Sequence, residues 1–294
     1  MSLKETATNT LQILDAGYFL APDGRRIDIE PALSQAIAGT RLYTPEQASE
    51  AFERLSLPTS HRPAIEVTDE TTQVAARRLV ESESMADLVL LNFASARNPG
   101  GGFINGAKAQ EEDLCRCSGL YPCLMAQRGY YEANRDCESV IYTDHLIYSP
   151  NVPWFRTRSR DQPDTAFLAS VITAPAPNAG IVLSRDPDAL PEVEAALRRR
   201  AGFVLAVAAD NGHRTVLLGA WGCGVFQNDP ALVADAFGSW LESDKFAGAF
   251  DRVVFAIYDR SKEQATLSGF RQRFIAGPIS GPHASASDSS GSDY

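Results

Sequence analysis

Long hydrophobic runs are missing from this sequence of 294 residues. No stretch approaches the roughly 18 apolar residues that a membrane helix needs, so we expect no membrane-spanning segment. The first residues lack the basic-then-apolar order of a secretory signal peptide, and this favours a cytoplasmic protein. The apolar fraction of 44% and the charged fraction of 22% are ordinary for a globular enzyme, and they exclude a collagen-like, coiled-coil or mostly disordered chain.

Basic residues are in the minority. The chain has 27 Lys and Arg against 37 Asp and Glu, which gives a formal net charge of −10. No large basic field is left to neutralise a nucleic-acid backbone, so we do not expect direct binding of duplex nucleic acid. An anionic ligand would have to be held mainly by backbone N–H groups and helix ends.

Cysteine and histidine are also scarce. The five cysteines are an odd number in a long chain, which favours reduced thiols over a disulfide framework. Cys115, Cys117 and Cys123 lie close together, but their gaps do not match the spacing of zinc ligands, and the four histidines form no spaced ligand set. We therefore predict no metal site and no cofactor.

Short apolar runs alternate with helical patterns along the chain. LVLLNF at 88–93 is almost uninterrupted, as expected for a strand buried on both faces. Further strands are predicted at 64–68, 140–148, 170–174, 215–219 and 253–259, and helices at 45–55, 70–83, 191–212, 231–243 and 262–274. The Pro- and Arg-rich stretch 150–165 is expected to be a loop across the sheet edge. The alternation predicts an α/β fold with a largely parallel sheet, whose binding sites lie beyond the carboxyl ends of the strands.

Three consecutive glycines, Gly100, Gly101 and Gly102, follow the strand at 88–93. Without Cβ atoms, backbone there can approach a ligand closely and point N–H groups at it. Glu111 and Glu112 come next, in a helical segment where adjacent side chains point about 100° apart. One carboxylate could hold a sugar hydroxyl while the other serves as an acid catalyst. The alternative is a flexible turn followed by a solvated first helical turn, where Glu is common.

A second glycine-rich stretch, at 218–230, follows another predicted strand. Two such loops could form one pocket and hold a diphosphate between them. Trp221 is expected in the core, whereas Phe226 is either a core residue or an aromatic that stacks on a base or sugar. Cys223 is either a nucleophile or a small residue that fills a tight loop, and the second is favoured because no His lies nearby in sequence.

Together the two motifs resemble those of a known enzyme family. NFASARNPGGGF followed by QEE is similar to the GGG-x(6–8)-QEE signature of poly(ADP-ribose) glycohydrolases, with seven residues between Gly102 and Gln110. YSPNVPWFR, VITAPAPN and LGAWGCGVFQNDP resemble further segments of the bacterial-type branch of that family. The resemblance implies a macrodomain, in which a mixed, largely parallel sheet lies between helices, preceded by an N-terminal helical extension.

The resemblance also implies an activity and a set of site residues. The activity is hydrolysis of the ribose–ribose O-glycosidic bonds of poly(ADP-ribose). Glu112 would be the general acid and then the base that activates water, and Glu111 would hold ribose hydroxyls. Asp69 stands in a turn similar to the GDIT turn of macrodomains and would bind the adenine amino group. The candidate substrate-binding residues are Asp69, Asn98, Gly100, Gly101, Gly102, Gln110, Gly222, Cys223, Gly224, Val225 and Phe226.

Three segments are expected: an N-terminal helical extension at 1–60, a catalytic macrodomain at 61–276, and a disordered tail at 277–294. The tail is predicted from its small and polar residues, which have no core to build.

Within this family we expect a monomer that releases ADP-ribose from the polymer end, has ADP-ribosylated proteins as partners and serves the DNA damage response. The alternatives are an ADP-ribose-binding macrodomain module and a mono-ADP-ribosyl-protein hydrolase. A pure binding module would have no need of the QEE motif, so its presence favours an enzyme.

Overall fold

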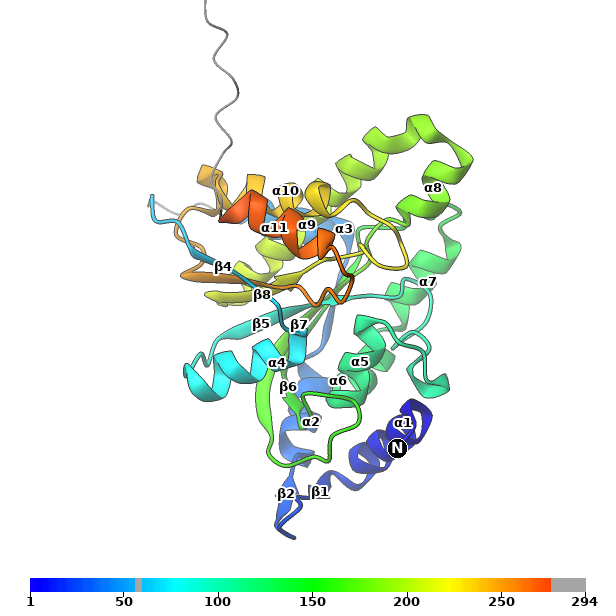
Figure 1. Cartoon of the computed structure of the whole chain (residues 1–294), viewed down its shortest axis with the longest axis vertical. Helices are drawn as coiled ribbons and strands as arrows, with labels where there is room; N and C mark the ends of the chain where they lie inside the picture. The colour runs from blue at the N-terminus through cyan, green and yellow to red at the C-terminus, as the bar shows by residue number, and fades with distance from the viewer. Residues whose placement is uncertain (56–59, 276–294) are drawn as a thin grey trace, which may run out of the picture.

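A seven-stranded mixed sheet forms the centre of the computed structural model, which describes residues 1–55 and 60–275 (Figure 1). The strand order is β3-β6-β7-β5-β8-β9-β4. The strands are β3 (Arg41–Tyr43), β4 (Ala64–Thr68), β5 (Leu88–Phe93), β6 (Leu146–Trp154), β7 (Phe167–Ala174), β8 (Thr215–Gly219) and β9 (Arg252–Ala256). β7, β5, β8, β9 and β4 run parallel, and β6 pairs antiparallel with both β7 and β3. This confirms the predicted α/β class. The predicted tail at 277–294 lies outside the described residues.

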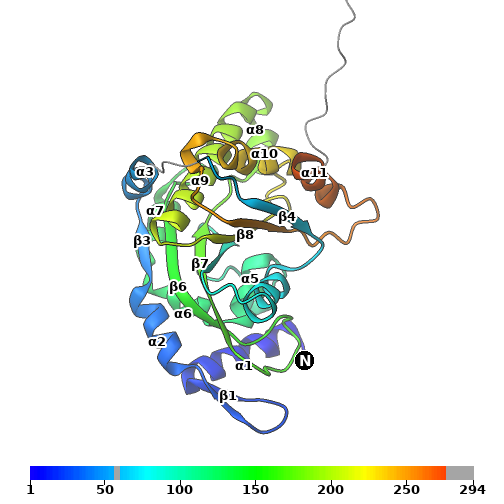
Figure 2. The same ribbon diagram turned by 90° about the vertical axis from the view of Figure 1, so that its left-hand side faces the viewer.

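Helices cover both faces of the sheet (Figure 2). α3, α9, α10 and α11 lie on one side, and α4, α5 and α6 lie on the other (Figure 1). The helices are α1 (Leu3–Ala16), α2 (Glu30–Gly39), α3 (Pro45–Arg54), α4 (Thr72–Arg77), α5 (Gln110–Cys117), α6 (Leu120–Ala126), α7 (Arg128–Asp136), α8 (Ala179–Arg185), α9 (Leu190–Asp210), α10 (Pro230–Leu241) and α11 (Ala265–Phe274). None of these described helices is long and apolar enough to cross a membrane.

Strand β5 shows why the sheet is buried on both faces. Val89 and Leu91 point into the core shared with α9 and α10, and Leu88 and Leu90 point into the core shared with α5 and α6. All four are at most 2% exposed. Because side chains alternate between the faces of a strand, two apolar faces require an uninterrupted apolar run. The prediction for 88–93 is confirmed with these bounds.

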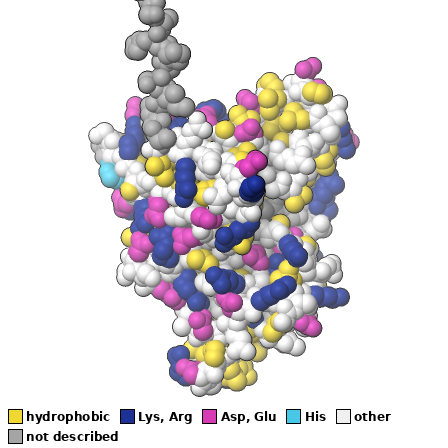
Figure 3. Space-filling view, viewed as in Figure 1, with side chains coloured by type: hydrophobic (Ala, Val, Ile, Leu, Met, Phe, Trp, Pro, Cys, Tyr) yellow, Lys and Arg dark blue, Asp and Glu magenta, His cyan; other side chains and the backbone are white. Residues whose placement is uncertain are grey.

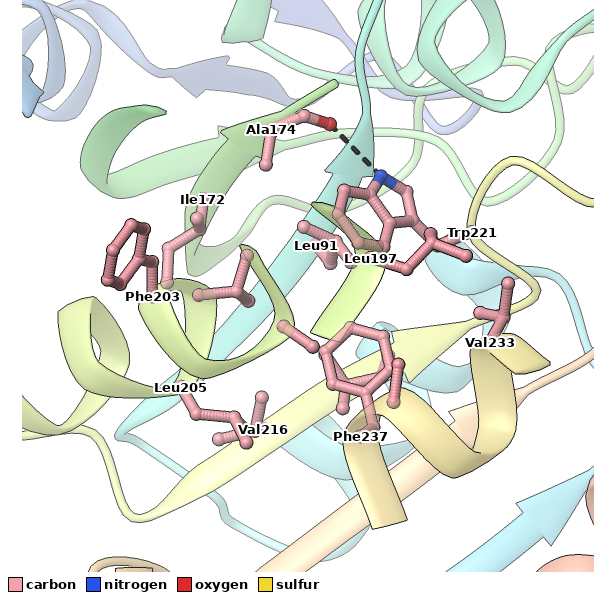
Figure 4. Packing of buried hydrophobic residues seen from close by; sticks show 14 of the residues in the cluster. Leu91, Ile172, Ala174, Leu197, Phe203, Leu205, Val216, Trp221, Val233 and Phe237 are labelled. Atoms are coloured by element: carbon pink, nitrogen blue, oxygen red, sulfur yellow. Dashed lines mark hydrogen bonds between the residues drawn. The ribbon is translucent and has the colours of Figure 1, made fainter. Parts of the chain in front are cut away.

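Trp221 is fully buried, as the sequence analysis expected. Its indole Nε1 donates a hydrogen bond of 3.1 Å to the carbonyl oxygen of Ala174, at the end of β7 (Figure 4). A buried indole N–H needs such a partner. The contact ties the loop after β8 to the end of β7.

The strand predicted at 140–148 is displaced, since β6 begins at Leu146. The buried guanidinium of Arg200 explains the difference. Its Nη2 donates to the carbonyl oxygens of Ile141 and Tyr142, at 2.7 and 2.8 Å. Those carbonyls therefore bind a side chain of α9 and not a neighbouring strand, and Tyr142 takes a left-handed backbone conformation.

The stretch 150–165 is only partly a loop, because its first five residues belong to β6. Pro150 and Pro153 are tolerated there because β3 pairs only with Leu146, Ile147 and Tyr148. Beyond Tyr148 that side of β6 pairs with no strand of the sheet and forms only a bridge between Trp154 and Ser118, so a missing N–H costs no ladder hydrogen bond there. The remaining residues, from 155 on, form an irregular segment before β7.

The N-terminal 60 residues contain helices α1, α2 and α3. Thr44 caps α3 and forms a capping box with Gln47. The segment also contains the hairpin of β1 (Tyr18–Leu20) and β2 (Arg26–Asp28), together with β3 of the central sheet, which the sequence analysis did not predict. The division at residue 60 stays a prediction.

Replacing Trp221 by Phe should lower the free energy of unfolding by about 2 kcal/mol, because the smaller ring leaves unfilled space in the core and the Ala174 carbonyl keeps only one of its two donors, the N–H of Ala94. Urea denaturation measures this loss. Trp240→Phe is the matched control: its indole also donates to a carbonyl, that of Arg198, but the side chain is only half-buried, so water can replace the bond. Equal losses for the two variants would contradict the assignment.

Candidate active site

The two glycine-rich loops leave the sheet at the same edge. β5 and β8 are parallel neighbours, so the loop at 94–109 and the loop at 220–229 both start at the carboxyl ends of their strands. The ends are close together, since a Cβ built on Gly219 would lie 2.9 Å from Cζ of Phe93. The structure therefore brings together the two glycine clusters that the sequence analysis singled out.

Glu111 lies in the first turn of α5 and is only 2% exposed. Its Oε2 accepts the backbone N–H of Ser95 at 2.7 Å, and its Oε1 accepts Nδ2 of Asn92 at 3.2 Å. Asn92 is fully buried at the end of β5, and its Nδ2 also donates to Thr173 on β7. The carboxyl group is thus held directly over the ends of two neighbouring strands.

Glu112 is 8% exposed and faces the triple-glycine loop. Its Oε1 accepts the N–H of Gly102 at 2.9 Å, and its Oε2 accepts the N–H of Ala109 at 3.1 Å. The second bond caps the start of α5, where backbone N–H groups have no partner within the helix. Two backbone donors therefore fix the position of this carboxylate.

Burial raises the pKa of Glu111 to about 8. Hydrogen bonds from Ser95 and Asn92 act in the opposite direction, and the charge of Glu112 raises the pKa further. Removal from water disfavours the charged form of a carboxyl group, and here this effect outweighs the two donors. A proton is therefore available inside the site near neutral pH.

Gly101 lets the loop approach the two glutamates. Its φ of +57° lies in the left-handed region, and a Cβ there would overlap the Glu112 carboxylate, at 2.9 Å from Cδ and 3.3 Å from Oε2 of Glu111. No other residue type fits this conformation and this space. Gly100 and Gly102 lie on either side, and Asn98 contributes its carbonyl oxygen to the turn as acceptor for the N–H of Gly101.

Gln110 holds α5 to β5. Its Oε1 accepts the N–H of Phe93 at 2.9 Å, and its Nε2 donates to the carbonyl oxygen of Leu91 and to the hydroxyl of Thr72. The side chain takes the place that a further strand partner would take at the end of β5. These bonds favour a positioning role for Gln110, and substrate binding by this residue stays a prediction.

The second loop offers backbone donors. Asn228 closes it, with Nδ2 bonded to the carbonyl oxygens of Pro177 and Gly222. The N–H groups of Gly224, Val225 and Phe226 donate to no described residue. Val225 is 80% exposed. Consecutive N–H groups without a protein partner are donors that an anion could bind.

Two residues of the second loop had alternative interpretations. Phe226 is partly buried and packs against the core, with its ring 6.0 Å from that of Tyr142. Burial raises the pKa of the Cys223 thiol to about 12. The thiolate is therefore scarce at neutral pH, which disfavours Cys223 as a nucleophile.

Asp69 is exposed at the carboxyl end of β4, beside a residue that the sequence analysis missed. The N–H of Ile257 donates to the carbonyl oxygen of Thr68 at 2.9 Å, so Tyr258 follows β9 next to Asp69. Tyr258 is 56% exposed, and the guanidinium of Arg260 lies 4.4 Å from its ring centroid. Tyr258 lies inside the strand predicted at 253–259, but β9 ends at Ala256, so only the structure shows that this residue leaves the sheet.

No group of three or more His, Cys, Asp or Glu side chains within residues 1–55 and 60–275 is placed to hold a metal ion. The cysteines form no disulfide, and three of them are buried.

Comparisons with known proteins identify the family. A family model described as microbial-type PARG, catalytic domain, matches residues 7–157. The chain belongs to the microbial-type PARG family. This confirms the resemblance to poly(ADP-ribose) glycohydrolases, and the chain is a glycosidase. No curated protein sequence matches it.

Solved PARG structures cover most of the chain. The enzyme from Thermomonospora curvata is 43% identical with a TM-score of 0.88, over 92% of this chain and 99% of that chain. A second structure of it, bound to the inhibitor ADP-HPD, is 43% identical with a TM-score of 0.86 over the same shares. PARG from Deinococcus radiodurans in complex with ADP-ribose is 49% identical with a TM-score of 0.78, over 84% of this chain and 98% of that chain.

Gly101→Ala should reduce turnover by this PARG-family enzyme about 100-fold, because the added Cβ displaces the Glu112 carboxylate. Steady-state kinetics measures the loss. Gly212→Ala is the matched control, since Gly212 also has a positive φ, of +78°, but has open space around its Cβ position. The two variants share the backbone strain, so equal activities would show that the contact with Glu112 is unimportant.

The raised pKa of Glu111 should make stability depend on pH. In the unfolded chain this carboxyl group ionises near its ordinary pKa of 4.5, whereas in the folded protein it stays protonated up to about pH 8. The folded state binds more protons between these values, so its stability falls as pH rises through this window. Relative to wild type, Glu111→Gln should therefore become more stable from pH 5 to pH 8.

Urea denaturation of both proteins across this pH range measures the effect. Titrating groups that do not interact with Glu111 cancel in the difference between wild type and variant. A difference that stays constant with pH would contradict the raised pKa of Glu111.

Proposed function

We propose that this PARG-family enzyme removes ADP-ribose units from the end of poly(ADP-ribose), with Glu112 as the general acid. The observation that carries the proposal is the pair of buried glutamates in the first turn of α5, held against the triple-glycine loop. Glycosidases place carboxyl groups at the bond that they cleave.

The contacts favour Glu112 over Glu111 as the proton donor. Glu112 is the more exposed of the two and lies against Gly101 and Gly102, along which the distal ribose would bind. It would protonate the departing ribose oxygen as the glycosidic bond breaks. The resulting carboxylate would then take a proton from the water that attacks the anomeric carbon, which restores the acid.

Glu111 would hold hydroxyls of the same ribose. Both of its oxygens already accept hydrogen bonds, from Ser95 and Asn92, so its position is fixed before substrate binds. A group held in this way orients substrate without having to move during the reaction.

The diphosphate would lie between the two glycine loops. The N–H groups of Gly224, Val225 and Phe226 have no partner in the described protein and could donate to its oxygens. An acidic chain can bind a dianion in this way without lysine or arginine. The bound diphosphate would also stabilise the positive charge that develops on the ribose.

Adenine would bind at the other end of the site. Asp69 could accept a hydrogen bond from the adenine amino group, and the exposed ring of Tyr258 could stack on the base. As part of this proposal the enzyme acts as a cytoplasmic monomer in the DNA damage response, on polymer attached to ADP-ribosylated proteins.

Purified poly(ADP-ribose) and a mono-ADP-ribosylated protein, with analysis of the products, test the proposal. Wild type should release ADP-ribose from the first time points, without oligomers, and should leave the mono-ADP-ribosylated protein intact. Early oligomers would instead indicate cleavage within the chain. Binding without any hydrolysis would contradict the activity.

Glu112→Gln should lower turnover by about 10²- to 10⁴-fold, because it cannot donate or recover a proton. Its affinity for ADP-ribose, measured by calorimetry, should change little, since the lost contribution belongs to the transition state. Glu111→Gln is the matched comparison and should lower affinity and turnover together. Near-full turnover by Glu112→Gln would transfer the acid role to Glu111, whose raised pKa suits it.

A further inference from the structure

Two exposed arginines without an ion-pair partner lie beside α5. Many arginines of this acidic chain pair with carboxylates, as Arg214 does with Asp251. Arg158 and Arg160 differ, because both are exposed and neither pairs with any described residue. They belong to the Arg-rich segment between β6 and β7, to which the proposed function assigns no role.

The segment is anchored to the helix that carries the catalytic glutamates. Ser159 is buried between the two arginines; its hydroxyl donates to the carboxylate of Asp113 and accepts Nε of Arg116 at 3.0 Å. Asp113 directly follows Glu112 in α5. Because Ser159 points toward α5, the fold presents the two arginines to solvent on either side of this contact.

Arg156 fixes the segment further. Its buried guanidinium donates from Nη1 to the hydroxyl of Thr10 and to the carbonyl oxygen of Arg116, both at 2.8 Å, and from Nε to the carbonyl oxygen of Asp161 at 3.1 Å. The backbone between 156 and 161 is thus held from both sides. The positions of the two exposed arginines are therefore set by the fold.

Basic and acidic side chains are interspersed on the surrounding surface. On the face seen in Figure 3, Lys and Arg side chains lie over the lower half of the molecule with Asp and Glu side chains among them, where Figure 1 places α4, α5 and the segment before β7. Nearby carboxylates include that of Asp164, which pairs with Arg77, and that of the exposed Asp161. With a net charge of −10, the protein as a whole repels a polyanion, so local cations decide where one can bind.

We propose that Arg158 and Arg160 form an outer subsite for poly(ADP-ribose), which binds the diphosphate of units next to the one being cleaved. The inference rests on the proposed function. Backbone N–H groups would hold the unit inside the site, whereas neighbouring units lie in solvent, where a guanidinium binds phosphate more strongly than a neutral donor does. Ser159, which lies between the two arginines, bonds to Asp113, the residue after the proposed acid in α5. The acid on this helix would meet the departing ribose and hence the rest of the polymer.

The test compares Arg158→Gln/Arg160→Gln with Arg185→Gln/Arg271→Gln. The control pair removes the same charge from exposed arginines of α8 and α11 that also lack ion-pair partners among the described residues. Each protein is assayed on long poly(ADP-ribose) and on a one-unit substrate, ADP-ribose linked at its 1″ position to 4-nitrophenol. ADP-ribose affinity is measured by calorimetry.

Arg158→Gln/Arg160→Gln should raise KM for the long polymer about tenfold at low salt and weaken its dependence on salt. Turnover of the one-unit substrate, ADP-ribose affinity and thermal stability should match those of wild type, because neither side chain bonds to the described protein. The control pair should behave as wild type on both substrates.

An unchanged KM for polymer would overturn the outer subsite, and so would an equal loss on the one-unit substrate. Single-stranded DNA could also inhibit cleavage of the polymer as strongly as added polymer of equal charge does. That result would show a surface that binds any nucleic acid, and it would overturn the outer subsite. Failure of wild type to cleave polymer, by contrast, would refute the proposed function itself, before any comparison of variants.

Discussion

Burial of two adjacent carboxyl groups at one edge of the sheet is the constraint on which the site depends. Groups of this kind are costly to remove from water unless donors meet them. The donors here are backbone N–H groups of Ser95, Gly102 and Ala109, all from the chain between β5 and α5. The backbone can come so close only where Gly101 has no side chain. The spacing of the GGG and QEE motifs is thus a packing requirement, in which a loop folds back on the helix that it precedes.

The same helix is anchored from several other directions. Gln110 ties its first residue to β5, and Asp113 accepts Nε2 of Gln73 on α4 at 3.0 Å. At its far end, the carbonyl oxygen of Arg116 accepts the hydroxyl of Thr10 on α1 at 2.8 Å. The N-terminal residues therefore pack directly on the helix that carries the two buried glutamates. Preorganisation of this kind lets the carboxyl groups hold their positions before substrate arrives.

Charge is divided between the interior of the site and its surroundings. Inside, unpaired N–H groups of the second loop offer partial positive charge without long side chains, which suits a ligand that must be enclosed. Outside, the two arginines that flank Ser159 carry full charges into solvent, where screening weakens any contact. Under the proposal, these two arginines hold a polyanion that the acidic chain as a whole repels.

Local pattern was sufficient for three of the strands and for the main motifs. The strands at 64–68, 88–93 and 215–219 have the predicted bounds, because short apolar runs that end at turn residues leave little choice of structure. Tertiary contacts decided the rest. The Arg200 side chain donates hydrogen bonds to carbonyl oxygens of a segment whose sequence predicts a strand. Burial raises the pKa of Glu111. Tyr258 lies next to Asp69 only because β9 pairs with β4. Each of these three features depends on contacts between residues far apart in the sequence, and a local sequence pattern cannot predict such contacts.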